Sequence, residues 1–479
     1  MNTEPEEASS RKARESGETP QPSTTAANSP RRSTDSSDGF VGTDRASDTH
    51  RQSTSRSTRR LTPKAARRRR MLTALIIMAV IFIVQNSLSN SGFADYLRAW
   101  SFAYLEAFLP DTTAERLQVV VMDIGEIAGG TPTQPLDRQK LWEIIDGLHD
   151  AEAAVVGIDN DFSPGPTGWR VPHGEYSDPK FFSHCQQWPE MPVVLGVFHN
   201  ADLSPNAWLG ASQFKGLAAY IGSAPIIEDA RLTRAETHYS GKAGATELPS
   251  MGYALAQKYV TTHSKGAFPQ PGSWLSLVVE PVGEPERVQL VNFSKLGQMT
   301  RESIWLPEKD PTGAANIPHY FKGKIVLLGD INPDNPRVID STDRFFAPGR
   351  KEEQPGVLYH ASAAYTFGFA PIYEFNKLTS VVLDILLGGI FLFAVWLQTR
   401  YQPQSRGIKA KIVRLAEQYA LIVAAILLVV IALIAITYFN ILWLDAAWVA
   451  LGLLLHYALP PHVKELFPKW TGGDFEEAS

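Results

Sequence analysis

The sequence contains a single cysteine, Cys185, and lacks the short motifs that mark common catalytic sites. One cysteine excludes an internal disulfide, and it also excludes a zinc site built from several thiolates. The nucleophile motif GxSxG, the zinc-protease motif HExxH and the phosphate loops GxGxxG and GxxxxGK are all absent. We therefore predict that the protein is not an enzyme and has no catalytic residues, no metal site and no cofactor.

Apolar residues are scarce in residues 1–70, which are rich in Ser, Thr, Arg and Pro. Such a segment cannot bury enough apolar surface to fold, so we expect a disordered arm. An arginine-rich arm can also bind nucleic acid, but acidic residues are interspersed along this one and dilute its positive charge. We therefore expect no nucleic acid partner.

Long apolar runs are present, and the first is residues 71–88, directly after the basic tract Arg67 to Arg70. Eighteen uncharged residues in a helix extend about 27 Å, close to the thickness of the hydrocarbon layer. A cleaved signal peptide is the alternative, but its charged region would be 70 residues long. The run predicts an uncleaved membrane anchor.

Three further apolar runs near the C-terminus predict three more transmembrane helices, at 378–397, 419–439 and 441–460. The last run is the weakest span, because it carries Asp445 and His456.

Basic residues beside these runs predict the orientation of the chain. Lys and Arg gather in the arm and in the loop 398–418, and both segments are therefore expected in the cytoplasm with the tail 461–479. Residues 89–377 then form a domain outside, and we expect a multi-pass protein of the bacterial cytoplasmic (inner) membrane.

The outside domain alternates short apolar runs with amphipathic segments. Apolar runs of this length are typical of parallel strands that helices cover on both faces. We expect strands at 117–124, 153–159, 191–198, 274–282, 287–293 and 324–330, and helices at 136–149 and about 356–367. The predicted class is α/β, with a mixed, mostly parallel sheet flanked by helices, plus the four transmembrane helices.

Polar side chains follow the expected strands at or just beyond their carboxyl ends. They are Asp123, Asp159, Asp161, His199 and Asp330. Open α/β sheets bind ligands at this edge, so these residues could form a pocket for a cation, an amine or a sugar. Alternatively, the carboxylates fix turns by accepting hydrogen bonds from the backbone.

Several motifs resemble those of the CHASE domain of the second type, a bacterial extracytoplasmic sensory domain. They are VVVMDIGE, DRQKLWEIIDGLHDAEAAVVGIDNDFS, IIEDARLTRA, ELPSMGYALAQKY, LVNF, FKGKIVLLGD and PGVLYHASAAYTF. The resemblance covers roughly residues 95–460 and includes one span before the domain and three after it. It adds Asp343 and His360 to Asp123 and Asp159 as motif positions whose role is unknown.

The chain departs from this family in ways that bear on function. Asp330 stands where small residues are usual. Residues 131–135 lack the usual aromatic-proline motif, so the ligand is expected to differ if this stretch shapes the ligand site. Relatives usually carry a cyclase, kinase or diguanylate cyclase after the last span, whereas only residues 461–479 follow it here.

We therefore expect a sensor or receptor subunit that passes a signal to a separate cytoplasmic signalling protein. The alternative is an envelope assembly or anchoring component that docks a protein partner without sensing a ligand. The sequence identifies neither the extracytoplasmic ligand nor that partner, and it leaves a homodimer open.

Overall fold

The computed structural model describes the chain in segments, all within the unit Arg59–Ser479. The described residues are 63–88, 98, 101, 117–125, 135–165, 168–197, 214–222, 234–239, 247–264, 266–284, 288–301, 320–331, 344–345, 347–348, 350–400 and 408–454. Most of the predicted arm 1–70, the tail 461–479, and the candidate residues His199 and Asp343 lie outside them.

A six-stranded sheet forms the centre of the domain, in the order β11-β1-β12-β2-β3-β4. All of its neighbouring strands run parallel. Its strands are β1 (Val119–Asp123), β2 (Val155–Ile158), β3 (Val193–Val197), β4 (Ala218–Tyr220), β11 (Thr300–Arg301) and β12 (Ile325–Gly329). The expected α/β class with a parallel sheet flanked by helices is confirmed.

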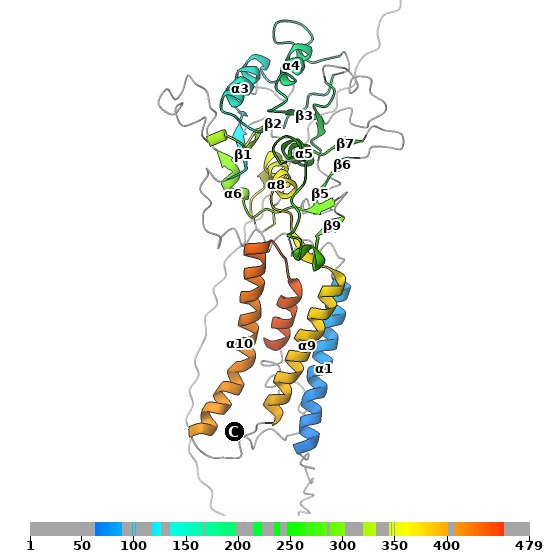
Figure 1. Ribbon diagram of the computed structural model, residues 1–479, viewed down its shortest axis with the longest axis vertical. Helices are drawn as coiled ribbons and strands as arrows, with labels where there is room; N and C mark the ends of the chain where they lie inside the picture. Colours follow the sequence, from blue (N-terminus) through cyan, green and yellow to red (C-terminus); the bar gives the residue numbers. More distant parts are fainter. Residues whose placement is uncertain are drawn as a thin grey trace, which may run out of the picture. The chain divides into compact units, whose positions relative to one another are not determined.

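Helices cover both faces of this sheet, as Figure 1 shows. Along β1, Val119 and Val121 pack in one core cluster and Val120 and Met122 in another, because successive side chains of a strand point to opposite faces. The first cluster includes residues of α5 (Met251–His263) and α8 (Gly356–Gly368). The second includes residues of α3 (Arg138–Asp150) and α4 (Asp178–Cys185).

Helix α3 begins with a capped first turn and a buried ion pair. The Asp137 side chain accepts hydrogen bonds from the backbone amides of Gln139 and Lys140. Arg138 then donates to Asp178, the first residue of α4, over 2.7 Å, and both side chains are 2% exposed. Neither charge is solvated, so each is stabilised mainly by the opposite charge of its partner. The pair therefore fixes the start of α3 against α4.

Helices α5 and α8 approach closely through small residues. A Cβ atom added to Gly252 would lie 2.5 Å from the Cβ of Ala363 and 3.0 Å from the backbone nitrogen of Ala364. No side chain larger than hydrogen fits there without a shift of the helices. The two helices therefore pack as a tight pair on one face of the sheet.

Short strands outside the main sheet pair antiparallel in separate small sheets. They are β5 (Arg234–Glu236), β6 (His238–Tyr239), β7 (Leu248–Pro249), β8 (Val279–Pro281), β9 (Gly283–Glu284), β10 (Val288–Leu290), β13 (Arg344–Phe345), β14 (Gln354–Pro355) and β15 (Tyr373–Phe375). The expected strand 274–282 is partly wrong, because Leu275–Leu277 form a 3-10 turn before β8.

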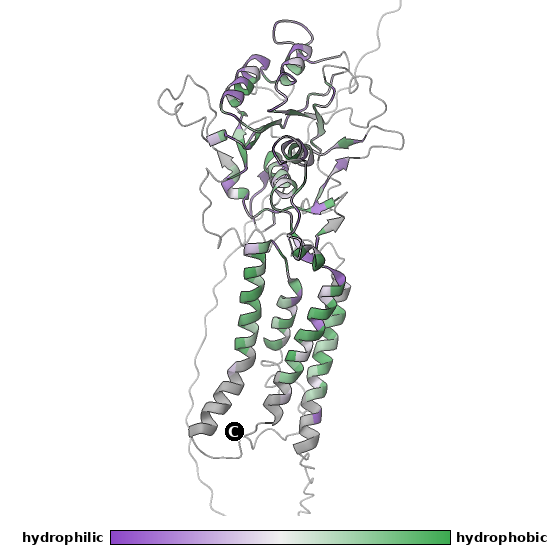
Figure 2. Cartoon of the chain, viewed as in Figure 1, coloured by the Kyte–Doolittle hydropathy of each residue, from purple (hydrophilic) through white to green (hydrophobic). Residues whose placement is uncertain are grey.

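Three long helices coincide with predicted spans: α1 (Pro63–Leu88), α9 (Lys377–Arg400) and α10 (Ile408–Phe439). Apolar residues cover much of their length (Figure 2). Among the described residues, one helical stretch, Ile422–Phe439, is long and apolar enough to cross a membrane. Met71–Val84 and Leu444–Leu454 are shorter apolar helices.

Strand β15 connects the domain to the turn that follows α10. The backbone amide of Tyr373 donates to the carbonyl of Asn440 over 2.9 Å, and the amide of Leu442 donates back to the carbonyl of Tyr373 over 2.8 Å. β15 also pairs with β8 on the domain side. We call the residues Tyr373, Asn440 and Leu442 the junction.

Candidate functional site

Two of the predicted site residues fix turns at the edge of the sheet. Asp123 accepts a hydrogen bond from the amide of Gly125 over 2.9 Å. Asp161 accepts one from the amide of Ser163 over 3.0 Å and pairs with Arg170 over 2.6 Å. These contacts agree with the turn-fixing alternative for both carboxylates.

Asp330 lies beside Asp123, as expected for residues that end neighbouring parallel strands. A Cβ atom on Gly125 would lie 2.9 Å from an oxygen of Asp330 and 3.2 Å from an oxygen of Asp123. The two carboxylates therefore lie together next to Gly125, where a larger residue would come too close to Asp330. Within the described residues, no group of three or more His, Cys, Asp and Glu side chains could hold a metal ion.

Asp159 follows β2 and differs from the other carboxylates in its surroundings. Its side chain is 5% exposed, and His360 lies beside it, with 4.0 Å between Oδ1 and Nε2. Burial without a close partner penalises the ionised form and raises the pKa of Asp159 to about 7. This carboxyl group can therefore take up or release a proton near neutral pH.

His360 lies on α8 and reaches the end of β4. Its Nε2 is 3.0 Å from the carbonyl oxygen of Ile221, and since a carbonyl only accepts, Nε2 must carry the hydrogen. This bond fixes the orientation of the ring, whose side chain is 6% exposed. His360 thus joins α8 to the sheet edge beside Asp159.

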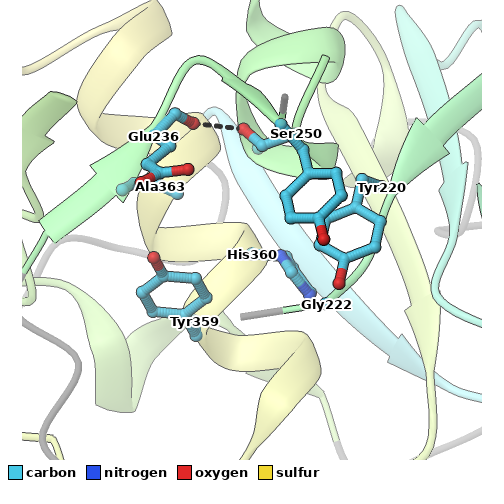
Figure 3. Close-up of a pocket in the computed structure, with 10 residues that line it drawn as sticks. Tyr220, Gly222, Glu236, Ser250, Tyr359, His360 and Ala363 are labelled. Atoms are coloured by element: carbon cyan, nitrogen blue, oxygen red, sulfur yellow. Dashed lines mark hydrogen bonds between the residues drawn. The ribbon is translucent and has the colours of Figure 1, made fainter. Parts of the chain in front are cut away.

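His360 also lines a small pocket (Figure 3). Its volume is about 10 Å³, which is about the space that one water molecule requires. The lining residues come from β4 and its end, β5, β6, the start of α5, and α8: Tyr220, Gly222, Ala235, Glu236, Tyr239, Ser250, Gly252, Tyr359, His360 and Ala363.

Hydrogen bonds and stacking hold the walls of this pocket. The rings of Tyr220 and Tyr239 stack with centroids 3.9 Å apart. The Tyr359 hydroxyl donates to the carbonyl of Arg234 over 2.6 Å. The Ser250 hydroxyl donates to the carbonyl of Glu236 over 2.6 Å and accepts from the amide of Tyr253 at the start of α5. The pocket is therefore largely preformed.

Burial also shapes the electrostatics of the pocket. It raises the pKa of Tyr220 to about 12 and raises that of Tyr359, so both hydroxyls stay neutral. Burial raises the pKa of Glu236 as well, although this carboxyl group is only partly buried. The arrangement can bind a small polar group, with neutral aromatic walls around one acidic side chain.

Sequence reasoning identified only His360 among the lining residues. The motif PGVLYHASAAYTF also contains Tyr359 and Ala363, which stand beside His360 and one helical turn after it on the same helix. Helical spacing from His360 could have pointed to Ala363, three residues later. Tyr220, Glu236 and Tyr239 lie in strands of two or three residues and carry no comparable signal.

One of three comparisons with known proteins agrees with the resemblance seen in the motifs. A search of curated proteins and a search of solved structures each returned no match. The family model of the CHASE2 domain matches residues 72–396, well over half of the chain. This is a family of extracytoplasmic sensory domains and not of catalytic ones. The chain therefore belongs to the CHASE2 domain family.

Proposed function

We propose that this protein is a membrane-anchored sensor that binds a ligand at the pocket beside His360 and passes a conformational change to its membrane helices. One observation carries the proposal. Helix α8 supplies Tyr359, His360 and Ala363 to the pocket, and the chain then continues into β15, whose Tyr373 is hydrogen-bonded at the junction.

The covalent path from the pocket to the first membrane helix after the domain is short. α8 ends at Gly368, β15 occupies Tyr373–Phe375, and α9 begins at Lys377. Asn376 lies between them, and its side chain accepts from the amide of Thr379 over 2.9 Å, which caps α9. A shift of α8 must therefore be absorbed within a few residues or transmitted to α9 and the junction.

A ligand shifts such a system only if it binds one arrangement better than the other. Helix α5 packs tightly against α8 at Gly252, so a shift of α8 would disturb this contact. A ligand larger than one water would have to widen the pocket, whose walls include both helices. Ligand entry would thus act directly on α8.

We propose further that the four apolar helices cross the membrane, with the domain outside and the N-terminus in the cytoplasm. The large apolar side chains exposed on them support this, for example Phe82, Ile385 and Ile426, at 53%, 68% and 58%. The Ser380 hydroxyl of α9 donates to Asp445 over 2.7 Å, which supports a bundle over a lone hydrated carboxylate. A separate cytoplasmic signalling protein would respond to the movement of this bundle.

Hydrogen exchange at the junction tests the coupling between the pocket and the membrane helices. We would compare the full-length protein with its His360→Ala variant in lipid nanodiscs and follow the amides of Tyr373 and Leu442 by mass spectrometry. If α8 transmits changes at the pocket, both amides should exchange at least severalfold faster in the variant, because their hydrogen bonds loosen.

The matched control is His149→Ala, which removes a partly exposed histidine from α3 on the opposite face of the sheet. It should leave the junction amides unchanged, and the α3 amides should exchange alike in the wild type and in His360→Ala. Unchanged exchange at Tyr373 and Leu442 in His360→Ala would refute the coupling. Faster exchange throughout the domain would instead indicate general loosening and would also count against it.

A further inference from the structure

The carboxylate of Glu236 lacks a counter-charge in the pocket. Glu236 lies on β5 and lines the cavity, and in the described part of the chain its side chain forms no hydrogen bond or ion pair. Figure 3 shows the side chains of Glu236, Tyr359, His360 and Tyr220 around one space.

Most of the neighbouring donor groups already have an acceptor. The hydroxyls of Tyr359 and Ser250 donate to the backbone carbonyls of Arg234 and Glu236, and Nε2 of His360 donates to Ile221. Tyr220 shares a hydrogen bond with Tyr239. A ligand in the pocket can therefore donate a hydrogen bond to one strong acceptor, the Glu236 carboxylate. Few hydrogen-bond donors remain that could bind an anion.

Three tyrosine side chains form part of the wall. Tyr220, Tyr239 and Tyr359 line the cavity together with Glu236. The face of an aromatic ring attracts a cation within about 6 Å of its centre, and a nearby carboxylate adds to that attraction when water is excluded. Asp159 lies 4.0 Å from Nε2 of His360 and adds negative charge near this residue whenever it is ionised. This combination disfavours carboxylate and phosphate ligands and favours cations.

The size of the cavity limits which part of a ligand can enter. About 10 Å³ accommodates one water molecule, and an ammonium group is of similar size. An aromatic or sugar ring would need a much larger space.

We propose that this pocket binds the ammonium group of a small primary amine, with Glu236 as its counter-ion and Tyr220, Tyr239 and Tyr359 as its aromatic wall. The inference rests on the proposed sensor function, and it names the chemical class of the ligand.

Thermal unfolding of the full-length protein in nanodiscs tests the ligand class at pH 8. The probes are ethylammonium, its neutral analogue ethanol, and acetate, each titrated to the same concentration. Ethylammonium should raise the melting temperature of the wild type in a saturable way, whereas ethanol and acetate should not. The Glu236→Gln variant should bind ethylammonium at least tenfold more weakly.

Two controls make the result specific to the pocket. Glu280→Gln changes an exposed carboxylate on β8, outside the pocket, and should bind ethylammonium like the wild type. Acidification should weaken binding to the wild type, because protonation of Glu236 removes the negative charge. Equal stabilisation by ethylammonium and ethanol, or an unchanged affinity in Glu236→Gln, would overturn the inference.

The outcomes separate this inference from the sensor function itself. If ethanol or acetate stabilises the wild type and His360→Gln abolishes the effect, the pocket is a ligand site but the amine class is wrong. If none of the three probes binds, the amine class is also wrong, and the exchange experiment at the junction still decides the coupling.

Discussion

Nε2 of His360 lies 4.0 Å from the carboxylate of Asp159, so helix α8 and the carboxyl end of β2 meet at two buried titratable groups. The same nitrogen donates to the carbonyl of Ile221 just after β4. One side chain of α8 therefore contacts the ends of two strands, next to the pocket. A change in the charge of Asp159 would act directly on His360 and thus on this helix.

The first prediction concerns Asp159→Asn and the dependence of stability on pH. Burial raises the pKa of Asp159 to about 7, so between about pH 4 and pH 7 the folded protein holds a proton that the unfolded chain has lost. Stability contributed by this group is therefore lost as pH rises through that window. Asparagine stays neutral, so the variant should be more stable than the wild type at pH 8, by on the order of a few kcal/mol.

Thermal unfolding between pH 4.5 and pH 8 measures this difference. The curves of melting temperature for the wild type and Asp159→Asn should converge at the acidic end. Asp150→Asn is the control, because the side chain of Asp150 is 87% exposed, and it should follow the wild type throughout. Parallel curves for Asp159→Asn and the wild type would show that Asp159 titrates normally.

The second prediction concerns the contact between α5 and α8. Gly252→Ala places a methyl group 2.5 Å from the Cβ of Ala363, so the variant should lose about 1–3 kcal/mol of unfolding free energy. Gly272→Ala is the matched control, because an added Cβ there meets no atom within 4 Å. Chemical denaturation of both variants measures the difference, and equal stabilities would contradict the close approach of the helices.

The third prediction concerns the ion pair of Arg138 and Asp178. Arg138→Ala leaves a buried carboxylate without its partner and should destabilise the domain by about 3–5 kcal/mol. Lys322→Ala breaks the ion pair with Glu152, whose two side chains are 58% and 65% exposed, and should cost less than about 1 kcal/mol. Similar losses in the two variants would mean that the Arg138 pair is solvated.

Four strands of the main sheet were predictable because they are buried on both faces and therefore form uninterrupted apolar runs. β1, β2, β3 and β12 each lie within the predicted segments. The strands β4 and β11 were missed, because they have only three and two residues. The strand prediction for 274–282 was partly wrong because the apolar residue Leu277 lies in a surface turn, where it is 75% exposed. An apolar run alone does not distinguish the two cases.

The candidate site was predictable only in part. An aspartate after a strand can fix a turn or face a ligand, and only its partners distinguish the two roles; Asp123 and Asp161 proved to hold backbone amides. His360 came from a family motif and does line the pocket. Glu236 and Tyr239 were missed, because strands this short show no alternation and only tertiary packing brings them to α8.

The central claim is that the domain between α1 and α9 faces away from the cytoplasm, where it can meet an extracellular ligand. Epitope tags at the N-terminus and after Gly272, followed by protease treatment of intact spheroplasts, test this directly. We predict that the tag at Gly272 is removed while the N-terminal tag survives until the cells are lysed. Loss of the N-terminal tag with survival of the tag at Gly272 would contradict the account.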